Sequence, residues 1–394
     1  MNNINYDDFP VAKNYCYLNT HGIGLTPVSV MEDVKNFLDK SINQPPFEVQ
    51  FENWIKMTND TRRLFSKLIN AKEEEISFQA NSSTGINIVA EILQLNNKDN
   101  IITDDLNFPS MVWPWRINKK NNPKIKMVKN KKGILKPEDY EELIDENTKL
   151  ITTSSVSFIN GFKNDLDKIG KITKNNNIYF LVDACLNTGY DNIDVQKCNI
   201  DFLVSSNYKW LMAGFGAAEF YCKKKHIDKF ETPHSGWFNH KQFPFPKSST
   251  DNPLENRLME YESPNHARKF EPGNPNYLSV YTLRKCLQYI NKIGLEKIRD
   301  KGYKIMHRLI EEIDSKVELH SSTKSKHLSL EIFFGIKNNT SKELHNKLRK
   351  EGIWAGTAAW DLGKESGVRI STHFYNKEEH IDKTITAIKK IINN

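Results

Sequence analysis

Residues 201–222, DFLVSSNYKWLMAGFGAAEFYC, contain the feature from which the chain is best interpreted. A strand-like run ends at Ser205, and Lys209 follows between Tyr208 and Trp210, ahead of a segment rich in glycine and alanine. An amine that loses solvent among aromatic and small side chains is more easily neutral, and a neutral amine is a nucleophile toward carbonyl carbons and a usable base. A lysine at a strand end is ordinarily a solvated surface group. Lys209 is therefore a candidate catalytic residue only if other parts of the chain support it.

The composition is that of an ordinary globular protein. The 394 residues are 38% hydrophobic and 27% charged, and the net charge of +7 comes from lysines spread along the sequence. This length predicts a large core and two domains. The sequence contains no basic tract interleaved with aromatic residues and no zinc-finger or helix-turn-helix signature, so a nucleic-acid partner is not expected.

The cysteines and the first residues indicate where the protein resides. The five cysteines are odd in number and lack CxxC spacing, which argues against a disulfide framework and fits a reducing cytoplasm. The eleven histidines form no HExxH motif, and no metal site is predicted. The polar start, MNNINYDDFPVAKNY, and the lack of about 18 uninterrupted apolar residues predict no signal peptide, no transmembrane helix and no membrane partner.

Short strand-like runs alternate with helical patterns through the first two-thirds of the chain. Apolar residues repeat at helical spacing in residues 84–95, and residues 137–146 and 165–176 also favour helices. The expected strands are rich in Ile, Val and Leu without clean alternation, which indicates burial on both faces and a mostly parallel sheet. They comprise residues 75–80, 100–105, 124–129, 149–157, 178–185 and 201–206.

The pattern changes near residue 240. Residues 241–256, KQFPFPKSSTDNPLEN, are rich in Pro and Ser and predict a loop. The remaining elements predict a smaller α+β domain on an antiparallel sheet: helices over 276–293, 294–315 and 341–352, strand-like runs HLSLEIFFG and GVRISTHFYN, and a helix from Lys377. We therefore place a large domain at residues 16–255 and a small domain at residues 256–394, and we assign residues 1–15 to the small domain as well.

Asp183 ends the apolar run IYFLVD, and Lys209 follows just past the end of the next strand. Ligands of such sheets bind beyond the carboxyl ends of the strands, so both residues and the turn Asn81–Thr84 are expected at one edge. A carboxylate behind so much apolar sequence needs a cationic partner. The pyridinium nitrogen of pyridoxal phosphate is one such cation, and Lys209 would hold its aldehyde carbon as a Schiff base. The Ser/Thr/Gly turn opens a helix whose N-terminal N–H groups favour a phosphate anion.

With these motifs the sequence resembles the class V aminotransferases of the fold-type-I pyridoxal-phosphate enzymes, the group that includes cysteine desulfurases, kynureninase and isopenicillin N epimerase. The resemblance runs from YLNTHGIG (17–24) to VRISTHFYN (368–376), with NSSTGINIVA, NFPSMVWPW, SFINGFKNDL, LVDA, SSNYKWL and EPGNPN between them. It implies an α/β fold with a mostly parallel seven-stranded sheet in the large domain, a smaller C-terminal α+β domain, and a homodimer with the active site at the subunit interface.

The resemblance also implies a role for each matching residue. Lys209 would bind the cofactor and move the Cα proton, and Asp183 would pair with the pyridine nitrogen. Four further residues, Ser83, Thr84, Ser206 and Tyr208, would contact the phosphate, and Phe108 would stack on the cofactor ring. Asn274 would reach the phosphate bound in the partner subunit. Arg369 would bind a substrate carboxylate, and His21 would contact the substrate.

Two departures from the family narrow the chemistry. No cysteine lies between Trp354 and Arg369, where cysteine desulfurases carry their nucleophile, so a persulfide mechanism through that loop is not expected. Leu186 stands where the family often has a glutamine that contacts the phenolic oxygen of the cofactor. Whether Cys185 or Asn187 substitutes for that glutamine stays open.

We expect an enzyme that acts at Cα of an amino-acid substrate. After Lys209 removes the Cα proton, transamination, loss of a β-substituent by a C–S lyase, and epimerisation compete. The sequence favours an aminotransferase, with the lyase as the next alternative, and it leaves the substrate open. A catalytically silent homologue that only binds a ligand is the alternative of another class, and the presence of both Lys209 and Asp183 argues against it.

Overall fold

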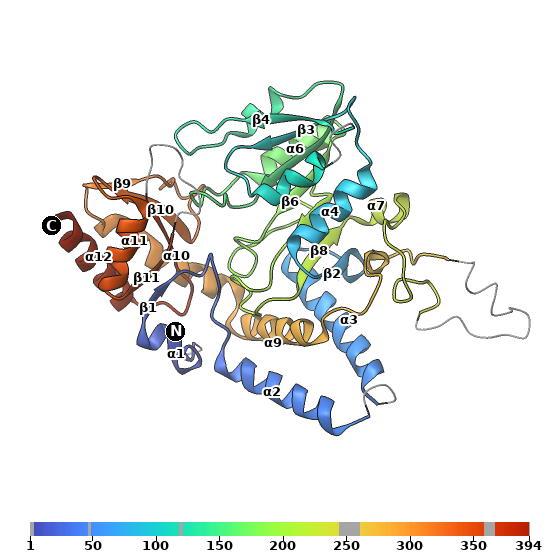
Figure 1. Cartoon of the computed structure of the whole chain (residues 1–394), viewed down its shortest axis with the longest axis horizontal. Coiled ribbons are helices and arrows are strands. Elements are labelled where there is room, and N and C mark those ends of the chain that lie inside the picture. Colours follow the sequence, from blue (N-terminus) through green and yellow to red (C-terminus); the bar gives the residue numbers. More distant parts are fainter. Residues whose placement is uncertain (1–3, 46–48, 118–120, 244–260, 358–366, 394) are drawn as a thin grey trace, which may run out of the picture.

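The structure is a computed structural model that describes residues 4–45, 49–117, 121–243, 261–357 and 367–393 (Figure 1). The predicted domain boundary at residue 255 and most of the predicted loop over 241–256 lie outside the described residues. Residues 358–366 of the stretch without cysteine also lie outside them. The division into two domains therefore stays a prediction, although the described strands form two separate sheets.

The larger sheet is mixed and mostly parallel, with strand order β2-β8-β7-β6-β5-β3-β4. Only β8 runs antiparallel to its neighbours, which are β2 and β7. The strands are β2 (Ile76–Gln79), β3 (Asn100–Asp104), β4 (Lys124–Val128), β5 (Thr148–Ser154), β6 (Tyr179–Asp183), β7 (Phe202–Val204) and β8 (Ala218–Cys222). The predicted α/β fold with a mostly parallel seven-stranded sheet is confirmed. The sequence pattern misses only β8, which follows a segment rich in glycine and alanine.

Helices cover both faces of this sheet. On one face α4 (Ser82–Leu93) packs its apolar side against strand residues such as Phe202 and Phe220. Leu203 and Tyr221 point to the other face, where residues of α3 and α6 complete the core. The other described helices of this unit are α2 (Val28–Asn43), α3 (Phe51–Leu68), α5 (Pro137–Glu141), α6 (Leu166–Asn175), α7 (Lys224–Lys229) and α9 (Tyr277–Ile293). The sequence assigns α9 to the small domain, but in the structure this helix packs against α3 and α2.

The helix predicted over residues 137–146 is shorter in the structure, where α5 ends at Glu141. The reason lies in Asp145, whose Oδ1 accepts the backbone N–H of Asn147 at 3.0 Å and the side-chain amide of Asn100 at 2.7 Å. Aspartate bonds of this kind compete with helical backbone bonds and favour a turn. The chain therefore leaves the helix early and enters β5.

The smaller sheet has the strand order β1-β11-β12-β10-β9. Its neighbours are antiparallel, as predicted, except for β1, which joins the edge of the sheet parallel to β11. Residues 16–18, which the sequence assigns to the large domain, thus pair within the second sheet. The elements are α1 (Pro10–Asn14), β1 (Cys16–Leu18), α10 (Leu295–Glu312), β9 (Val317–Leu319), β10 (Glu331–Ile336), α11 (Ser341–Lys350), β11 (Ile353–Thr357), β12 (Val368–Ser371) and α12 (Glu378–Asn393).

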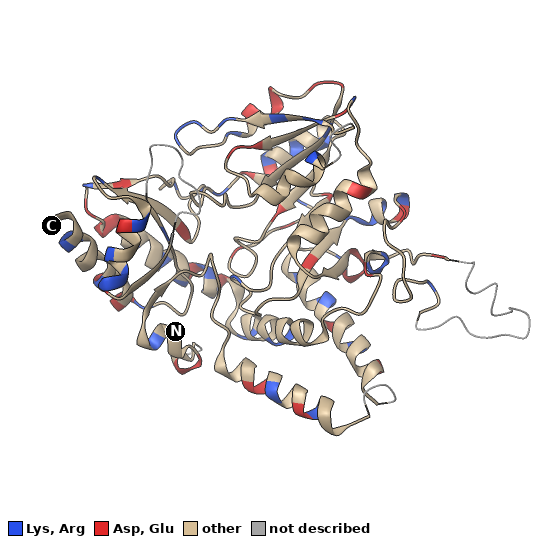
Figure 2. Ribbon diagram, in the orientation of Figure 1, with Lys and Arg blue, Asp and Glu red and all other residues tan. Residues whose placement is uncertain are grey.

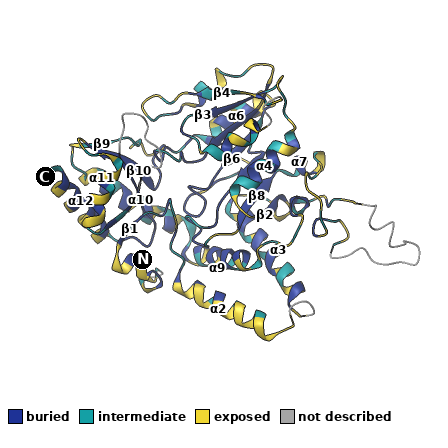
Figure 3. Ribbon diagram, in the orientation of Figure 1, coloured by how far each residue is buried: buried dark blue, intermediate teal, exposed yellow. Residues whose placement is uncertain are grey.

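Charged residues of both signs are interspersed on the outer helices. On α2 the acidic Asp33 and Asp39 alternate with Lys35 and Lys40 (Figure 2). Figure 3 shows that this helix is largely exposed on one side, whereas the strands of the two sheets are mostly buried. In the described part of the chain, no helix combines the length and apolar character needed to span a membrane.

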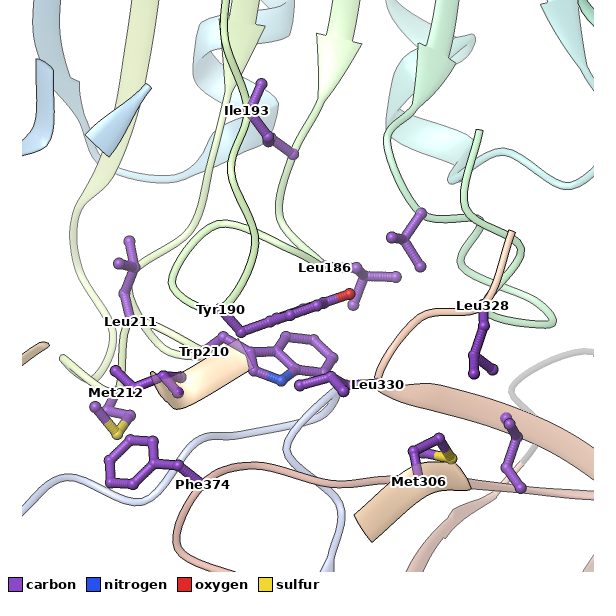
Figure 4. Packing of buried hydrophobic residues seen from close by; sticks show 14 of the residues in the cluster. Leu186, Tyr190, Ile193, Trp210, Leu211, Met212, Met306, Leu328, Leu330 and Phe374 are labelled. Carbon is purple, nitrogen blue, oxygen red and sulfur yellow. The ribbon is translucent and has the colours of Figure 1, made fainter. Parts of the chain in front are cut away.

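The two sheets share one hydrophobic core, and Trp210 lies fully buried within it. Figure 4 shows its indole next to Tyr190 and to Leu330, which precedes β10. The ring centroids of Tyr190 and Trp210 are 5.2 Å apart, and the indole Nε1 donates to the Thr372 carbonyl at 3.3 Å. Because Trp210 is anchored in both units, it holds the backbone of the preceding Lys209 at their junction.

Residues 19–27, which follow β1, cross this junction directly above Lys209. The N–H of Gly24 donates to the Tyr208 carbonyl at 2.7 Å. A Cβ atom at Gly24 would lie only 1.8 Å from the Lys209 carbonyl oxygen, a backbone atom that cannot move aside cheaply. The approach of these two backbone segments therefore depends on the missing side chain at position 24.

We expect Gly24→Ala to lower the free energy of unfolding by about 1–3 kcal/mol, because an added methyl group forces the two backbone segments apart. The midpoint of urea denaturation measures this loss. Gly273→Ala is the matched control, since a Cβ atom there meets nothing within 4 Å. Equal midpoints for the two variants would contradict the close packing described above.

Candidate active site

A cavity of about 210 Å³ opens where the carboxyl ends of β5, β6 and β7 face β12 of the second sheet. Its walls come from the loops that follow the strands of the large sheet, from residues 19–27 and from β12. The lining residues are His21, Gly22, Ser82, Phe108, Ser154, Val156, Phe158, Asp183, Cys185, Leu186, Tyr208, Lys209 and Arg369. The structure thus brings together His21, Phe108, Asp183, Tyr208, Lys209 and Arg369 of the predicted site residues, and it leaves Ser83, Thr84, Ser206 and Asn274 outside this lining.

Asp183 is a nearly buried carboxylate at the end of β6. Its Oδ1 accepts the N–H of Cys185 at 2.8 Å, and its backbone carbonyl accepts both the N–H and the hydroxyl of Ser155 at 2.7 and 3.1 Å. These bonds fix the backbone and one carboxylate oxygen. The Cys185 thiol also hydrogen-bonds to this carboxylate, which lines the cavity and can pair there with a cation.

Lys209 projects from the loop after β7 into the same cavity. Its Nζ lies 5.8 Å from the centroid of the Tyr208 ring, and no ion pair or hydrogen bond joins the amine to the described residues. Tyr208 in turn stacks on Phe215, with ring centroids 4.6 Å apart. Burial, aided by the nearby Cys185 and Asp183, raises the pKa of Tyr208 to about 12, so its phenol stays a hydrogen-bond donor at neutral pH.

Arg369 lines the cavity, and one edge of its guanidinium has no partner among the described residues. Its Nη1 donates to the Phe158 carbonyl at 2.8 Å and lies 3.3 Å from Oε1 of Glu331, while its Cζ sits 4.7 Å from the centroid of the Phe158 ring. Its Nε is buried and, like Nη2, makes no hydrogen bond to the residues that the structure describes. Two adjacent N–H groups of this kind match the two oxygens of a carboxylate. The free edge can therefore bind a carboxylate side-on.

His21 is a buried, neutral imidazole. Burial, followed by the charges of Arg369 and Lys209, holds its pKa well below the ordinary value. Its Nδ1 lies 2.8 Å from the Ser371 hydroxyl, which also accepts the backbone N–H of His21 at 2.9 Å. Because Nδ1 is the one acceptor in reach of the serine proton among the described residues, we assign the tautomer with hydrogen on Nε2. Nε2 has no partner in the described structure and can donate to a ligand.

The turn before α4 differs in detail from the prediction. Asn81 caps the helix and accepts the N–H and the hydroxyl of Thr84 at 3.0 and 3.2 Å, and the Ser83 hydroxyl donates to Ser110 at 2.9 Å. The side chains of Ser83 and Thr84 are thus engaged within the chain, and Ser82 is the residue of this turn that lines the cavity. The N–H groups of the first helical turn still favour an anion at this end.

The position of the family's glutamine is apolar. Leu186 lines the cavity and packs into the core. Asn187 is turned away from it, since its Oδ1 accepts the Ser155 hydroxyl at 2.6 Å. Of the two flanking residues, only Cys185 faces the cavity. Asn274 is exposed outside the cavity, where its Oδ1 accepts the Tyr277 hydroxyl at 3.1 Å.

Sequence reasoning missed three residues that shape the site. Ser82 could have been found by placing the helix cap at Asn81. Phe158 lies in the quoted motif SFINGFKNDL, and its ring meets Phe108 edge-on at 4.9 Å. Glu331 carried the clearest signal, because it is a charged residue inside the apolar run HLSLEIFFG.

These residues fit pyridoxal phosphate. Asp183 offers a carboxylate for a pyridinium nitrogen, Lys209 offers a free amine for an aldehyde, and the first turn of α4 offers N–H groups for a phosphate. The hydroxyl of Ser206 is buried without a partner among the described residues. An unsatisfied buried hydroxyl is costly, and a bound phosphate oxygen would satisfy it.

The five cysteine thiols of the chain are protonated at neutral pH and therefore weakly nucleophilic. All five cysteines are free, and four are buried while Cys198 is partly buried. Burial is the main cause that raises the pKa of each thiol, to about 11 for Cys16 and Cys198 and further for Cys185, Cys222 and Cys286. A nucleophilic thiol must be a thiolate, so none of these groups is activated at neutral pH.

Known proteins match this chain along nearly its whole length. The sequence profile of the class V aminotransferases matches residues 16–384. A protein of Borreliella burgdorferi named "Probable cysteine desulfurase" is 33% identical over 98% of this chain and 95% of its own length. An uncharacterised aminotransferase of Bacillus subtilis is 25% identical, with 85% of each chain covered. The apo structure of a cysteine desulfurase from Thermococcus onnurineus superposes with a TM-score of 0.87 and 25% identity, covering 98% of this chain and 96% of that one.

We expect iodoacetamide at neutral pH to leave Cys185 unlabelled in the native protein and to modify it fully after denaturation in urea. The reason is that burial and the neighbouring Asp183 keep the thiol protonated and covered. Peptide mass spectrometry measures the label at each position. The partly buried Cys198 is the internal control, and labelling of Cys185 before Cys198 would contradict this description.

Proposed function

The chain belongs to the class V aminotransferases, and from this premise we propose that it is a pyridoxal-phosphate enzyme acting at Cα of an amino-acid substrate. The observation that carries the proposal is the convergence of three charged groups in one cavity. These are the amine of Lys209, the carboxylate of Asp183 and the guanidinium of Arg369. Charged side chains that converge in a cleft are candidates for a catalytic site.

Pyridoxal phosphate bound there supplies an electron sink that acidifies the Cα proton of an attached amino acid. Asp183 holds the pyridinium nitrogen, and the first turn of α4 with Ser206 holds the phosphate. Arg369 binds the substrate carboxylate on its Nε–Nη2 edge, which orients Cα. Lys209 then removes the Cα proton with its Nζ. His21 donates from Nε2 to an acceptor on the substrate, and the walls at Phe108, Phe158 and Leu186 exclude water from Cα.

We propose that the bond broken next is the Cβ–S bond of a sulfur-bearing amino acid. The electron pair left at Cα expels the sulfur, and hydrolysis completes the reaction, so that cysteine and water give pyruvate, ammonia and hydrogen sulfide. The relatives named "Probable cysteine desulfurase" support cleavage of this bond. The buried, protonated thiols of this chain support release of sulfur as a free product rather than transfer to an enzyme cysteine.

Transamination, which the sequence alone favoured, is the second candidate. The uncharacterised aminotransferase of Bacillus subtilis supports it, as does Lys209, which can move a proton away from Cα and deliver it elsewhere. Epimerisation has less support, because it needs a second acid on the far side of Cα. Two proton-bearing groups in the described lining, the thiol of Cys185 and the phenol of Tyr208, hold their protons too tightly for that task.

A homodimer and a cytoplasmic location complete the proposal. Trp113, Ile117 and Phe215 are large apolar side chains that are 61%, 76% and 63% exposed, and we propose that a second copy of the chain covers them. Asn274 lies exposed outside the cavity, where it could serve the partner's site. Five free cysteines fit a reducing compartment.

We expect the holoenzyme, given L-cysteine without a keto acid, to form pyruvate, ammonia and sulfide in equal amounts over many turnovers. Lactate dehydrogenase coupling, glutamate dehydrogenase coupling and a methylene-blue assay measure the three products. A single stoichiometric conversion of the cofactor, reversed by a keto acid, would identify transamination instead. Intact-mass analysis after the reaction should show no added sulfur on the protein.

We expect Lys209→Ala to lower turnover about a thousandfold or more, because the variant lacks the group that moves the Cα proton. The variant should also lose the cofactor absorbance that wild-type protein retains after gel filtration. Lys129→Ala is the control, since the side chain of Lys129 is 76% exposed and does not line the cavity. Unchanged turnover in Lys209→Ala would overturn the role of Lys209, and no turnover in the wild type would favour the silent homologue that only binds a ligand.

A further inference from the structure

Glu331 is a buried carboxyl group beside the cavity that the proposed chemistry does not use. It begins β10 and is only 1% exposed. The strand register places it opposite Ser371 of β12, the residue that orients His21. Its Oε1 accepts from Nη1 of Arg369, whereas its Oε2 is buried without a partner in the described part of the chain. A carboxylate with one unsatisfied oxygen is costly at such a position unless it gains a proton or a ligand.

Among the described residues, three charged or titratable groups face Glu331 from the elements packed around it. These are Arg369 of β12, Lys209 after β7 and Tyr190 after β6. Tyr190 stays neutral, because burial raises its pKa well above the ordinary value. Burial raises the pKa of Glu331 to about 7, although Arg369 and Lys209 oppose this shift. The carboxyl group therefore changes its charge near neutral pH.

Glu331 and a substrate carboxylate would share a single guanidinium. The Nη1 corner of Arg369 belongs to Glu331 and to the Phe158 carbonyl, and the Nε–Nη2 edge is free for a ligand. Two carboxylates beside one buried cation repel each other, and one of them gains a proton more readily as a result. Because the ligand carboxylate is paired bidentately, the proton goes to the unpaired Oε2 of Glu331.

We propose that Glu331 is a positioning residue that holds Arg369 and couples binding of the substrate carboxylate to the uptake of one proton. This inference rests on the proposed function, because it requires Arg369 to bind that carboxylate. Below neutral pH the proton is already on Glu331 when the ligand arrives. Above neutral pH it must be taken from solvent, so the affinity for the carboxylate falls as pH rises.

The test uses the holoenzyme and propionate, a carboxylate without an amine to titrate. We expect its Kd to rise about tenfold between about pH 6 and about pH 8 in the wild type, as for a single linked proton. Glu331→Gln keeps the shape and the oxygen that accepts from Nη1, but it cannot take up a proton. Its Kd should change far less over the same range. Calorimetry at about pH 8 in two buffers of different ionisation enthalpy should show about one proton taken up by the wild type and none by the variant.

Arg369→Leu distinguishes a failure of the proposed carboxylate site from a failure of the proton coupling at Glu331. If Arg369→Leu weakens propionate binding and Glu331→Gln keeps the wild-type pH dependence, the inference about Glu331 is overturned and the carboxylate clamp stands. If Arg369→Leu leaves binding unchanged, the clamp fails and the inference fails with it. A uniform loss of affinity in Glu331→Gln at every pH would show a merely structural role. Should that variant not fold, proton counting on the wild type alone decides, and zero uptake overturns the inference.

Discussion

The burial of Trp210 is the constraint on which the rest of the site depends. Its indole is enclosed by both units, its Nε1 donates to Thr372, and its carbonyl lies 3.1 Å from Nε2 of His373. An aromatic side chain of this size contributes strongly to a core. The lysine before it therefore cannot leave the junction, and a lysine between two aromatic residues acquires a simple explanation. Trp210 enters the core, Tyr208 lines the cavity, and the amine between them also faces the cavity.

The same junction explains why the cavity is charged. Asp183, Lys209, Arg369 and Glu331 come from different elements, and both Arg369 and Glu331 keep a buried polar atom without a partner among the described residues. Buried charged groups are costly when unpaired, and they are tolerated where a ligand completes them. A pyridinium at Asp183, an aldehyde at Lys209 and a carboxylate at Arg369 would complete three of these groups, whereas a proton would complete Glu331. Ligands that bind only the folded state also stabilise it, so folding and cofactor loading are thermodynamically linked.

The parts of this site that follow from local pattern could be predicted from the sequence, and those that follow from long-range pairing could not. Asp183 and Lys209 are visible because each ends a strand of a parallel sheet, and such strand ends meet at one edge. The pairing of β1 with β11 joins segments far apart in the chain, and no local signal reveals it. The partner of Glu331 is likewise set by the register between β10 and β12. A charged residue within an apolar run indicates a buried charged group, but the sequence pattern does not predict which cation lies next to it.

The positions of the five cysteine thiols bear on the proposed release of sulfur from the substrate. A carbanion at Cα is common to transamination, elimination and epimerisation, and the surrounding acids and nucleophiles decide its fate. A desulfurase that keeps sulfur on the protein needs a thiolate near the leaving group, which requires exposure and a nearby positive charge. In this chain the one cysteine that faces the cavity, Cys185, is buried against Asp183, and the negative charge of that carboxylate opposes ionisation of the thiol. The arrangement that suits Asp183 to a pyridinium thus makes its neighbour a poor sulfur acceptor, and sulfur expelled from Cβ would leave the site unbound.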